Sequence, residues 1–197
     1  AASDVYKRQL LAQPGNTTAK ELRDKAMLEL LYATGIRVSE LISLKLEDVN
    51  MQIGYITCHD SSKDRMIPFG KGAKQALRTY LDKARSSLLK GRACEWLFTN
   101  CSGQPMSRQG FWKLIKYYGE KAGIKEDITP HTLRHSFAAH LIGDVADIHA
   151  VQAMLGHGDT GASQMYAVDF IIESVKKYGK EPVSYTHLRA HETSAHL

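Results

Sequence analysis

The sequence contains few cysteines and no long apolar run. Cys58, Cys94 and Cys101 are the only cysteines among 197 residues, and no two of them form a C-x-x-C pair. An odd number of cysteines without paired spacing disfavours a disulfide framework and a cysteine-rich zinc site, and it favours a reducing cytoplasm. No stretch approaches the roughly 18 uninterrupted apolar residues of a membrane-spanning helix, so we expect no membrane association.

Common nucleotide-binding and metal-binding motifs are also missing. The glycines around Lys71 do not fit the P-loop pattern G-x-x-x-x-G-K-[ST]. His191 and His196 stand five positions apart, so they do not share a helix face as the two histidines of a zinc-protease motif do. Residues 1–9 carry charged side chains and no apolar centre, so we do not expect a secretory signal peptide.

The composition is that of a folded protein. Hydrophobic residues make up 43% and charged residues 24% of the chain, which is ordinary for a globular domain, and the length fits one domain better than two. The formal net charge is +5. This charge is compatible with a nucleic-acid partner but does not require one, because lysines often only solvate a helix face.

The two ends of the chain differ from its middle. Residues 1–16 show no helical periodicity and close with a turn signal, so we expect an N-terminal tail or linker, either native or foreign to the domain. Residues 182–197 hold three of the nine histidines among small polar residues. We expect a C-terminal tail there, disordered or not native, and a single domain over residues 17–181.

The middle of the chain alternates between helical and strand-like patterns. Apolar residues from Leu22 to Leu31 recur at helical spacing, and Gly35 predicts the end of that helix. Ser39 is expected to cap a short second helix. Residues 53–58 and 65–69 then predict a β-hairpin, and residues 95–99 a third strand. Further helices are predicted over residues 74–89, 107–122, 130–142, 148–155 and 170–178. The predicted fold class is therefore mainly α with a small three-stranded antiparallel sheet (α+β).

Four short clusters carry side chains suited to phosphodiester chemistry. Arg37 stands between a helix stop and a helix start, and His131 and Arg134 share a helix face because they are three positions apart. His157 lies between two glycines, and Tyr166 follows nine residues later. Guanidinium groups neutralise phosphate oxygens, an imidazole moves a proton and a phenol attacks, so this set has the components for phosphodiester cleavage without a metal ion.

Each cluster alone has an ordinary explanation in packing, capping or turn formation, and only their order and spacing point to a function. That order resembles the tyrosine recombinase (lambda-integrase-like) family, most of all its bacterial Xer-type members. The resemblance covers residues 22–168. It rests on ATGIRVSEL at 33–41, TPHTLRHSF at 129–137, and LGHGD at 155–159 followed by Tyr166.

The resemblance implies a mechanism. Tyr166 would attack the scissile phosphate of double-stranded DNA, leaving a 3′-phosphotyrosyl bond and a free 5′-hydroxyl. Arg37, Arg134 and His157 would hold the phosphate, and His131 would assist proton transfer from the phenol. Because the phosphotyrosine preserves the energy of the broken bond, religation would need no ATP, metal ion or other cofactor.

One departure from the family pattern concerns the hairpin loop. Relatives use a lysine there as the general acid for the 5′-oxygen, ahead of an Arg-x-x-Pro segment that residues 65–68 match. The usual lysine position holds Asp60, which would repel a phosphate. Lys63 is our candidate for this role, since one or two residues of slack in a mobile loop amount to several ångströms; the alternative is that no lysine serves. Glu40 matches an acidic position that supports the site in relatives.

The resemblance also implies partners. We expect self-association into dimers or tetramers on DNA, no small-molecule substrate, and a location at the nucleoid in the bacterial cytoplasm. Residues 170–178 resemble a tail helix that docks on a neighbouring subunit, and packing on its own domain is an equal alternative. The role in the cell, either chromosome-dimer resolution or the integration and excision of a mobile element, stays open.

A second departure concerns length. Relatives carry an N-terminal helical domain that clamps the DNA, and the chain offers no room for it before Leu22. We therefore expect a catalytic fragment that binds DNA weakly and with steep salt dependence. Two other functions fit the same residues: a non-catalytic DNA-binding module, which Asp60 suggests, and a type IB topoisomerase-like nicking-closing enzyme.

Overall fold

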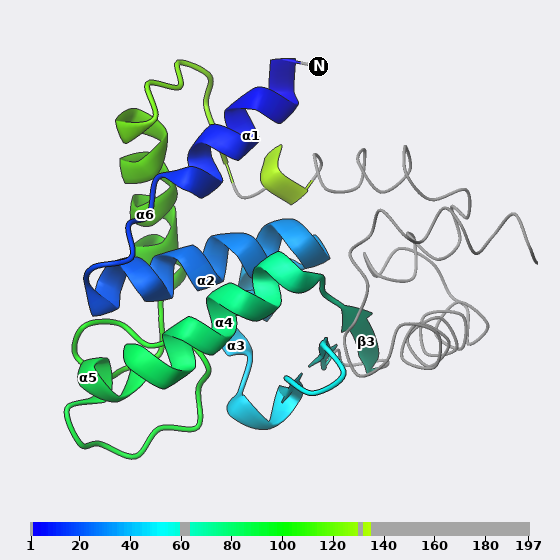
Figure 1. Cartoon of the computed structure of the whole chain (residues 1–197), viewed down its shortest axis with the longest axis vertical. Helices are drawn as coiled ribbons and strands as arrows, with labels where there is room; N and C mark the ends of the chain where they lie inside the picture. The colour runs from blue at the N-terminus through cyan, green and yellow to red at the C-terminus, as the bar shows by residue number, and fades with distance from the viewer. Residues whose placement is uncertain (1, 60–63, 130–131, 135–197) are drawn as a thin grey trace, which may run out of the picture.

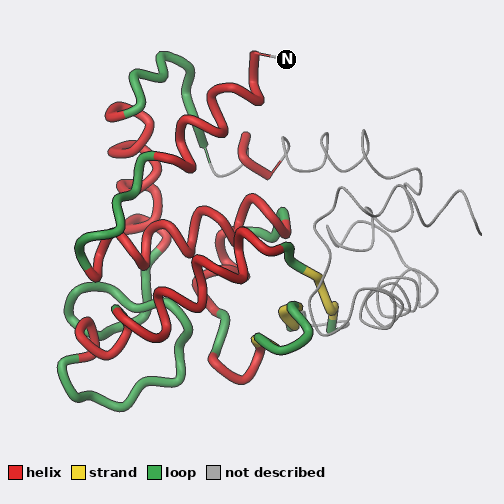
Figure 2. The backbone as a smooth tube through the Cα atoms, in the orientation of Figure 1, coloured by secondary structure: helices red, strands yellow, loops and turns green. Residues whose placement is uncertain are grey.

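The computed structural model describes residues 2–59, 64–129 and 132–134. Helices make up most of this part, and a small sheet lies at one edge of them (Figures 1 and 2). The prediction of a mainly α fold with a three-stranded antiparallel sheet is confirmed. In chain order the elements are α1 (Ala2–Ala12), α2 (Ala19–Thr34), α3 (Val38–Ser43), the 3₁₀ helix η1 (Leu46–Asp48), β1 (Val49–Asn50), β2 (Tyr55–Cys58), β3 (Arg65–Pro68), α4 (Lys71–Lys83), α5 (Arg85–Leu89) and α6 (Arg108–Lys121).

Helix α2 ends where Gly35 predicts, and a capping box at Thr18 marks its start. The Thr18 hydroxyl accepts a hydrogen bond from the Glu21 amide at 3.1 Å, and the Glu21 carboxylate accepts one from the Thr18 amide at 2.9 Å. This reciprocal capping box satisfies two amides that the first turn leaves without helical partners. At the other end Gly35 adopts φ 61°, and its amide donates to the Leu31 carbonyl. A left-handed residue at this point favours glycine, so the chain turns there toward Arg37.

Helices α2 and α4 lie side by side and contribute much of the core (Figure 1). The interior contains Met27, Leu30 and Leu31 from α2 and Leu77 and Tyr80 from α4, each at most 1% exposed. The helix predicted over residues 74–89 is present as two pieces, because the backbone at Ala84 leaves helical geometry between α4 and α5. The helix predicted over residues 107–122 is confirmed as α6, with the Ser107 hydroxyl capping its first turn.

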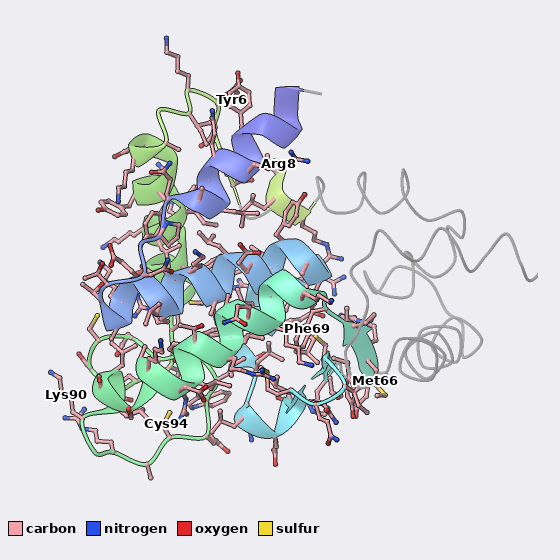
Figure 3. All side chains as sticks on the ribbon, viewed as in Figure 1. Tyr6, Arg8, Met66, Phe69, Lys90 and Cys94 are labelled. Carbon is pink, nitrogen blue, oxygen red and sulfur yellow. The ribbon has the colours of Figure 1, made fainter. Side chains whose placement is uncertain are left out.

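The sheet has the strand order β1-β2-β3, and the predicted hairpin forms its larger part. Ile56 pairs with Ile67 and Cys58 with Arg65, so alternate residues of both strands face the core. Figure 3 labels Phe69, which follows β3 near the start of α4, and Met66 toward the outer edge of the sheet. Phe69 is 1% exposed, so the end of the hairpin is anchored in the core.

The predicted third strand over residues 95–99 is wrong, because β1 occupies that place in the sheet. Residues 95–99 form only isolated bridges, Lys45 with Trp96 and Thr99 with Pro105. Their hydrogen bonds go elsewhere: the Glu95 carbonyl accepts from the Leu46 amide at 2.9 Å, and the Trp96 carbonyl accepts from the Arg85 guanidinium at 2.6 Å. A backbone with such partners has no need of a neighbouring strand.

Part of residues 1–16, which we expected to form a tail or linker and which show no helical periodicity, is the helix α1. Leu10 on this helix is 0% exposed and belongs to the core, and α1 contacts α2. One buried leucine gives little periodicity to read, so only the tertiary contact identifies the helix. None of the helices in the described ranges is long and apolar enough to span a membrane. The helices predicted over residues 148–155 and 170–178, and the predicted tail, lie outside the described residues.

Candidate active site

Arg37 is placed by the turn that joins α2 to α3. It is the N-cap of α3, with extended backbone angles, and its amide donates to the Glu40 carboxylate at 2.6 Å. Ser39, which we expected to cap this helix, instead lies within its first turn. The carboxylate of Glu40 does the capping, so Arg37 is held outside the helix with its side chain 43% exposed.

Glu40 joins two arginines that are far apart in the sequence. Its Oε1 atom lies 3.4 Å from the Arg37 guanidinium and also accepts a hydrogen bond from the Arg65 guanidinium, at the start of β3. The Glu40 and Arg65 side chains are 11% and 10% exposed, so the pair is well screened from water. Charge-assisted hydrogen bonds of this kind fix side-chain orientation, so Glu40 holds both guanidinium groups in place.

Arg134 lies on a second element that reaches the same region. Residues 132–134 are helical, and the Thr129 hydroxyl and carbonyl accept from the amides of Thr132 and Leu133 at 3.1 Å. Leu133 is 4% exposed and packs in the core, and Arg134 is 8% exposed. The buried leucine therefore anchors the turn that carries Arg134.

Arg37 and Arg134 line one hollow of about 860 Å³. Helix α6 forms another part of its wall, through Arg108, Gln109 and Lys113. Trp112 adds an aromatic surface on the same helix and is 36% exposed. Ile36 and Val38 make part of the lining apolar, and the cationic side chains beside them can contact a phosphate-bearing ligand.

The electrostatics of the hollow show how closely its arginines gather. Burial lowers the pKa of Arg134 most, and the nearby positive charges of Arg37 and Arg65 lower it further. The Glu40 carboxylate opposes this pKa shift without cancelling it. Arginine stays protonated in proteins even so. We call Arg37, Arg65 and Arg134 the arginine cluster. The positive charges of this cluster repel one another, and a bound anion would reduce that repulsion.

Two of the six predicted site residues lie among the described residues, and the structure brings them together at the arginine cluster. Lys63, His131, His157 and Tyr166 lie outside the described residues, as does Asp60. Arg65 was not among the predicted site residues, although the Arg-x-x-Pro segment had drawn attention to it. Its signal was a charged residue at a core-facing position of a strand, which needs a buried partner. The contribution of α6 was missed as well, because its lysines fit an ordinary solvated face.

Comparison with known protein families identifies the class of protein. The model of the phage integrase family matches residues 4–170. The chain therefore belongs to this family, as its motifs suggested.

Individual relatives are more specific. The chain is 49% identical over 159 residues to the tyrosine recombinase XerD of Staphylococcus haemolyticus, a match that covers 80% of this chain and 54% of that protein. Among solved structures, the XerA recombinase is similar with a TM-score of 0.71 and 29% identity, covering 89% of this chain and 64% of that one. The XerH recombinase, in a post-cleavage complex with its palindromic difH substrate, has the same fold, with a TM-score of 0.66, 21% identity, and coverage of 89% and 51%. The chain spans about half the length of the curated relatives it matches.

Proposed function

We propose that this chain is the catalytic part of a tyrosine site-specific recombinase, which cleaves and rejoins double-stranded DNA through a 3′-phosphotyrosyl intermediate. The observation that carries the proposal is the hollow lined by Arg37 and Arg134. These residues are almost 100 positions apart in sequence, yet they line the same hollow, and the charge of Arg37 helps to lower the pKa of Arg134. Membership of the phage integrase family and the similarity to XerD proteins support the same assignment.

The arginine cluster would supply electrostatic stabilisation of the reacting phosphate. Attack on a phosphodiester builds negative charge on the non-bridging oxygens, and preoriented guanidinium groups stabilise that charge without reorganising. Burial strengthens the interaction because little water competes for it. We assign Arg37 and Arg134 to the phosphate and Glu40 to the orientation of Arg37. Arg65 would contribute through Glu40.

The remaining steps are assigned from the sequence. Tyr166 would attack phosphorus and form the phosphotyrosyl bond, and the 5′-oxygen would leave as a hydroxyl. His131 would take the phenolic proton, and His157 would help to hold the phosphate. Lys63 would protonate the 5′-oxygen in place of the lysine that Asp60 replaces. None of these steps requires a nucleotide or metal cofactor.

Helix α6 would guide the DNA to the hollow. Arg108 and Lys113 present positive charge along its wall, and Gln109 offers an amide beside them. Contacts from arginine and lysine to phosphate position a duplex, while glutamine can pair with a base edge. XerH was solved on DNA, which agrees with a DNA partner for this chain. We further propose that two or four copies assemble on the duplex at the bacterial nucleoid.

A nicked suicide substrate tests the function directly. The substrate would be a duplex library with a randomised core and a nick beside the cleavage point, so that the released fragment diffuses away and traps the covalent complex. We expect a protein–DNA adduct that withstands denaturation and maps to Tyr166. Tyr166→Phe should abolish it, whereas Tyr117→Phe, a change at a tyrosine 55% exposed on α6, should not.

Other outcomes would point to the alternatives. DNA binding without any adduct would mean a DNA-binding module that has lost catalysis. An adduct accompanied by relaxation of supercoiled plasmid, but by no recombinant product, would favour a nicking-closing enzyme.

A further inference from the structure

His59 forms an unusual contact at the end of the hairpin where β2 leads into the connecting loop. Its Nε2 atom lies 2.9 Å from the Asp48 Oδ1, and its Nδ1 atom lies 2.9 Å from the Asp64 Oδ1. A carboxylate offers only acceptors, so both ring nitrogens must donate. Only the doubly protonated imidazolium can satisfy this geometry, because a neutral ring would set a lone pair against a carboxylate oxygen.

The contact ties together three segments of the chain. Asp48 belongs to η1 and is 5% exposed, and its other oxygen accepts from the Lys45 amide at 2.8 Å. His59 directly follows β2, and Asp64 directly precedes β3. The last pair in the register of these strands is Cys58 with Arg65. His59 and Asp64 thus extend the hairpin by one side-chain pair and attach it to a buried carboxylate that is hydrogen-bonded at the start of η1.

The attachment continues into the arginine cluster. Asp64 is the neighbour of Arg65, whose guanidinium donates to Glu40, and Glu40 in turn accepts from the Arg37 amide. Any freedom at the start of β3 would change the direction in which the Arg65 side chain leaves the strand. A displacement of about 1 Å of a side chain at such a site can lower the reaction rate roughly a hundredfold.

We infer that His59 is a positioning residue, whose imidazolium clamps both stems of the hairpin onto η1 and thereby holds Arg65 against Glu40. The effect of this clamp on DNA cleavage rests on the proposed function, whereas the clamp itself does not. In the sequence, His59 stands immediately before Asp60, the position where the expected lysine is replaced.

The clamp depends on pH. Hydrogen bonds to Asp64 and then to Asp48 raise the pKa of His59 above its ordinary value of 6.5, and they outweigh the opposing effect of burial. Among described residues, these two carboxylates are the charged groups that act on the ring; Glu40 and Arg65 act on the neighbouring Cys58 instead. Because the folded pKa is raised, the clamp is complete below pH 6.5. It is lost as the pH rises through the raised pKa.

Two substitutions separate charge from titration. His59→Lys keeps a cation between the carboxylates that does not titrate near neutrality, and His59→Gln removes the charge at every pH. The ring is largely exposed, at 59% of the side chain, so neither change should unfold the domain. Asp64→Asn, at a carboxylate 60% exposed, removes one partner of the clamp and leaves the histidine in place.

The first experiment observes the clamp without catalysis. Proton NMR of the whole chain should give His59 a titration midpoint above 6.5 that falls in Asp64→Asn. Amide hydrogen exchange in β3, corrected for the intrinsic pH dependence, should lose protection as the pH rises in the wild type, stay protected in His59→Lys and be fast throughout in His59→Gln. Equal protection in the wild type and His59→Gln at pH 6 would overturn the inference.

The second experiment measures the rate of adduct formation on the suicide substrate. We expect about a tenfold lower rate in His59→Gln at pH 6, and a flatter pH profile in His59→Lys than in the wild type. Identical profiles in all three proteins would overturn the positioning role. A wild-type chain that forms no adduct at any pH would instead refute the recombinase proposal, and the exchange data would still decide on the clamp.

Discussion

The Glu40 carboxylate accepts a hydrogen bond from the guanidinium of Arg65, a residue 25 positions later in the chain. Through this contact the loop between α2 and α3 is joined to the first residue of β3. The same carboxylate accepts a hydrogen bond from the Arg37 amide. Glu40 therefore orients both the backbone at Arg37 and the guanidinium of Arg65.

Glu40→Gln should weaken both the fold and the site. The amide retains the shape but removes the negative charge that Glu40 sets against the buried Arg65 guanidinium. Breaking such a pair from one side typically costs a few kcal/mol, and we expect the free energy of unfolding to fall by about 2–4 kcal/mol. Urea denaturation measures this change. Glu47→Gln, at an exposed position, is the control and should change the stability by less than about 0.5 kcal/mol. Equal midpoints for the two variants would contradict the prediction.

Tyr118→Phe should destabilise the packing of α6 on α2. The Tyr118 hydroxyl donates to the Asp24 Oδ2 at 3.0 Å, and Asp24 is 1% exposed. Burial raises the pKa of Asp24, while hydrogen bonds from Arg23 and Tyr118 oppose that rise. Removing one buried donor should cost about 1–3 kcal/mol.

The adjacent residue supplies a matched control for this change. Tyr117→Phe alters a tyrosine that is 55% exposed, so its thermal unfolding should resemble that of the wild type. If the melting temperatures of the two variants agree within error, the hydrogen bond to Asp24 contributes nothing measurable to stability.

Cys58 should be inert toward thiol reagents in the folded protein. Burial, followed by the negative charge of Glu40, raises the pKa of this thiol from 9.0 to about 12. Thiolate is the reactive form, so only about one thiol in ten thousand would be ionised at pH 8. Mass spectrometry after brief labelling with iodoacetamide should find Cys101, which is exposed, modified well before Cys58.

The same pKa shift has a consequence for stability. Between pH 9 and about 12 the unfolded thiol loses its proton while the folded one keeps it, so the contribution of Cys58 to stability falls as the pH rises. If Cys58 in the native protein is labelled as fast as in urea, its side chain is not buried as we describe.

Lys113→Gln should reduce the salt dependence of DNA binding. If Lys113 contacts a phosphate from the wall of the hollow, its loss should lower the slope of log affinity against log salt by about 1, equally for all DNA sequences. Lys90→Gln is the control, because Lys90 follows α5 at the far end of the helical layer (Figure 3). Fluorescence anisotropy at several salt concentrations measures both, and an unchanged slope for Lys113→Gln would remove α6 from the DNA-binding surface.

Local signals in the sequence were sufficient for several elements. Gly35 predicted the end of α2, and two short apolar, β-branched-rich runs around a polar segment predicted the β2–β3 hairpin. These features depend on hydrogen bonds and backbone angles within a few residues, so neighbouring residues specify them. Local patterns failed for residues 95–99 and for α1, where the deciding partners, such as the Arg85 guanidinium and the core around Leu10, come from elsewhere in the chain.

The sequence by itself indicated the family, through the order of Arg37, His131, Arg134, His157 and Tyr166, and it predicted the chemical groups of the site. The tertiary structure decided which groups meet. It placed Arg37 and Arg134 on one hollow and joined Arg65 to Glu40. It also set His59 between two carboxylates. Spacing along a helix or strand reports neighbours within a few residues, whereas charge partners brought together by burial depend on how whole elements pack.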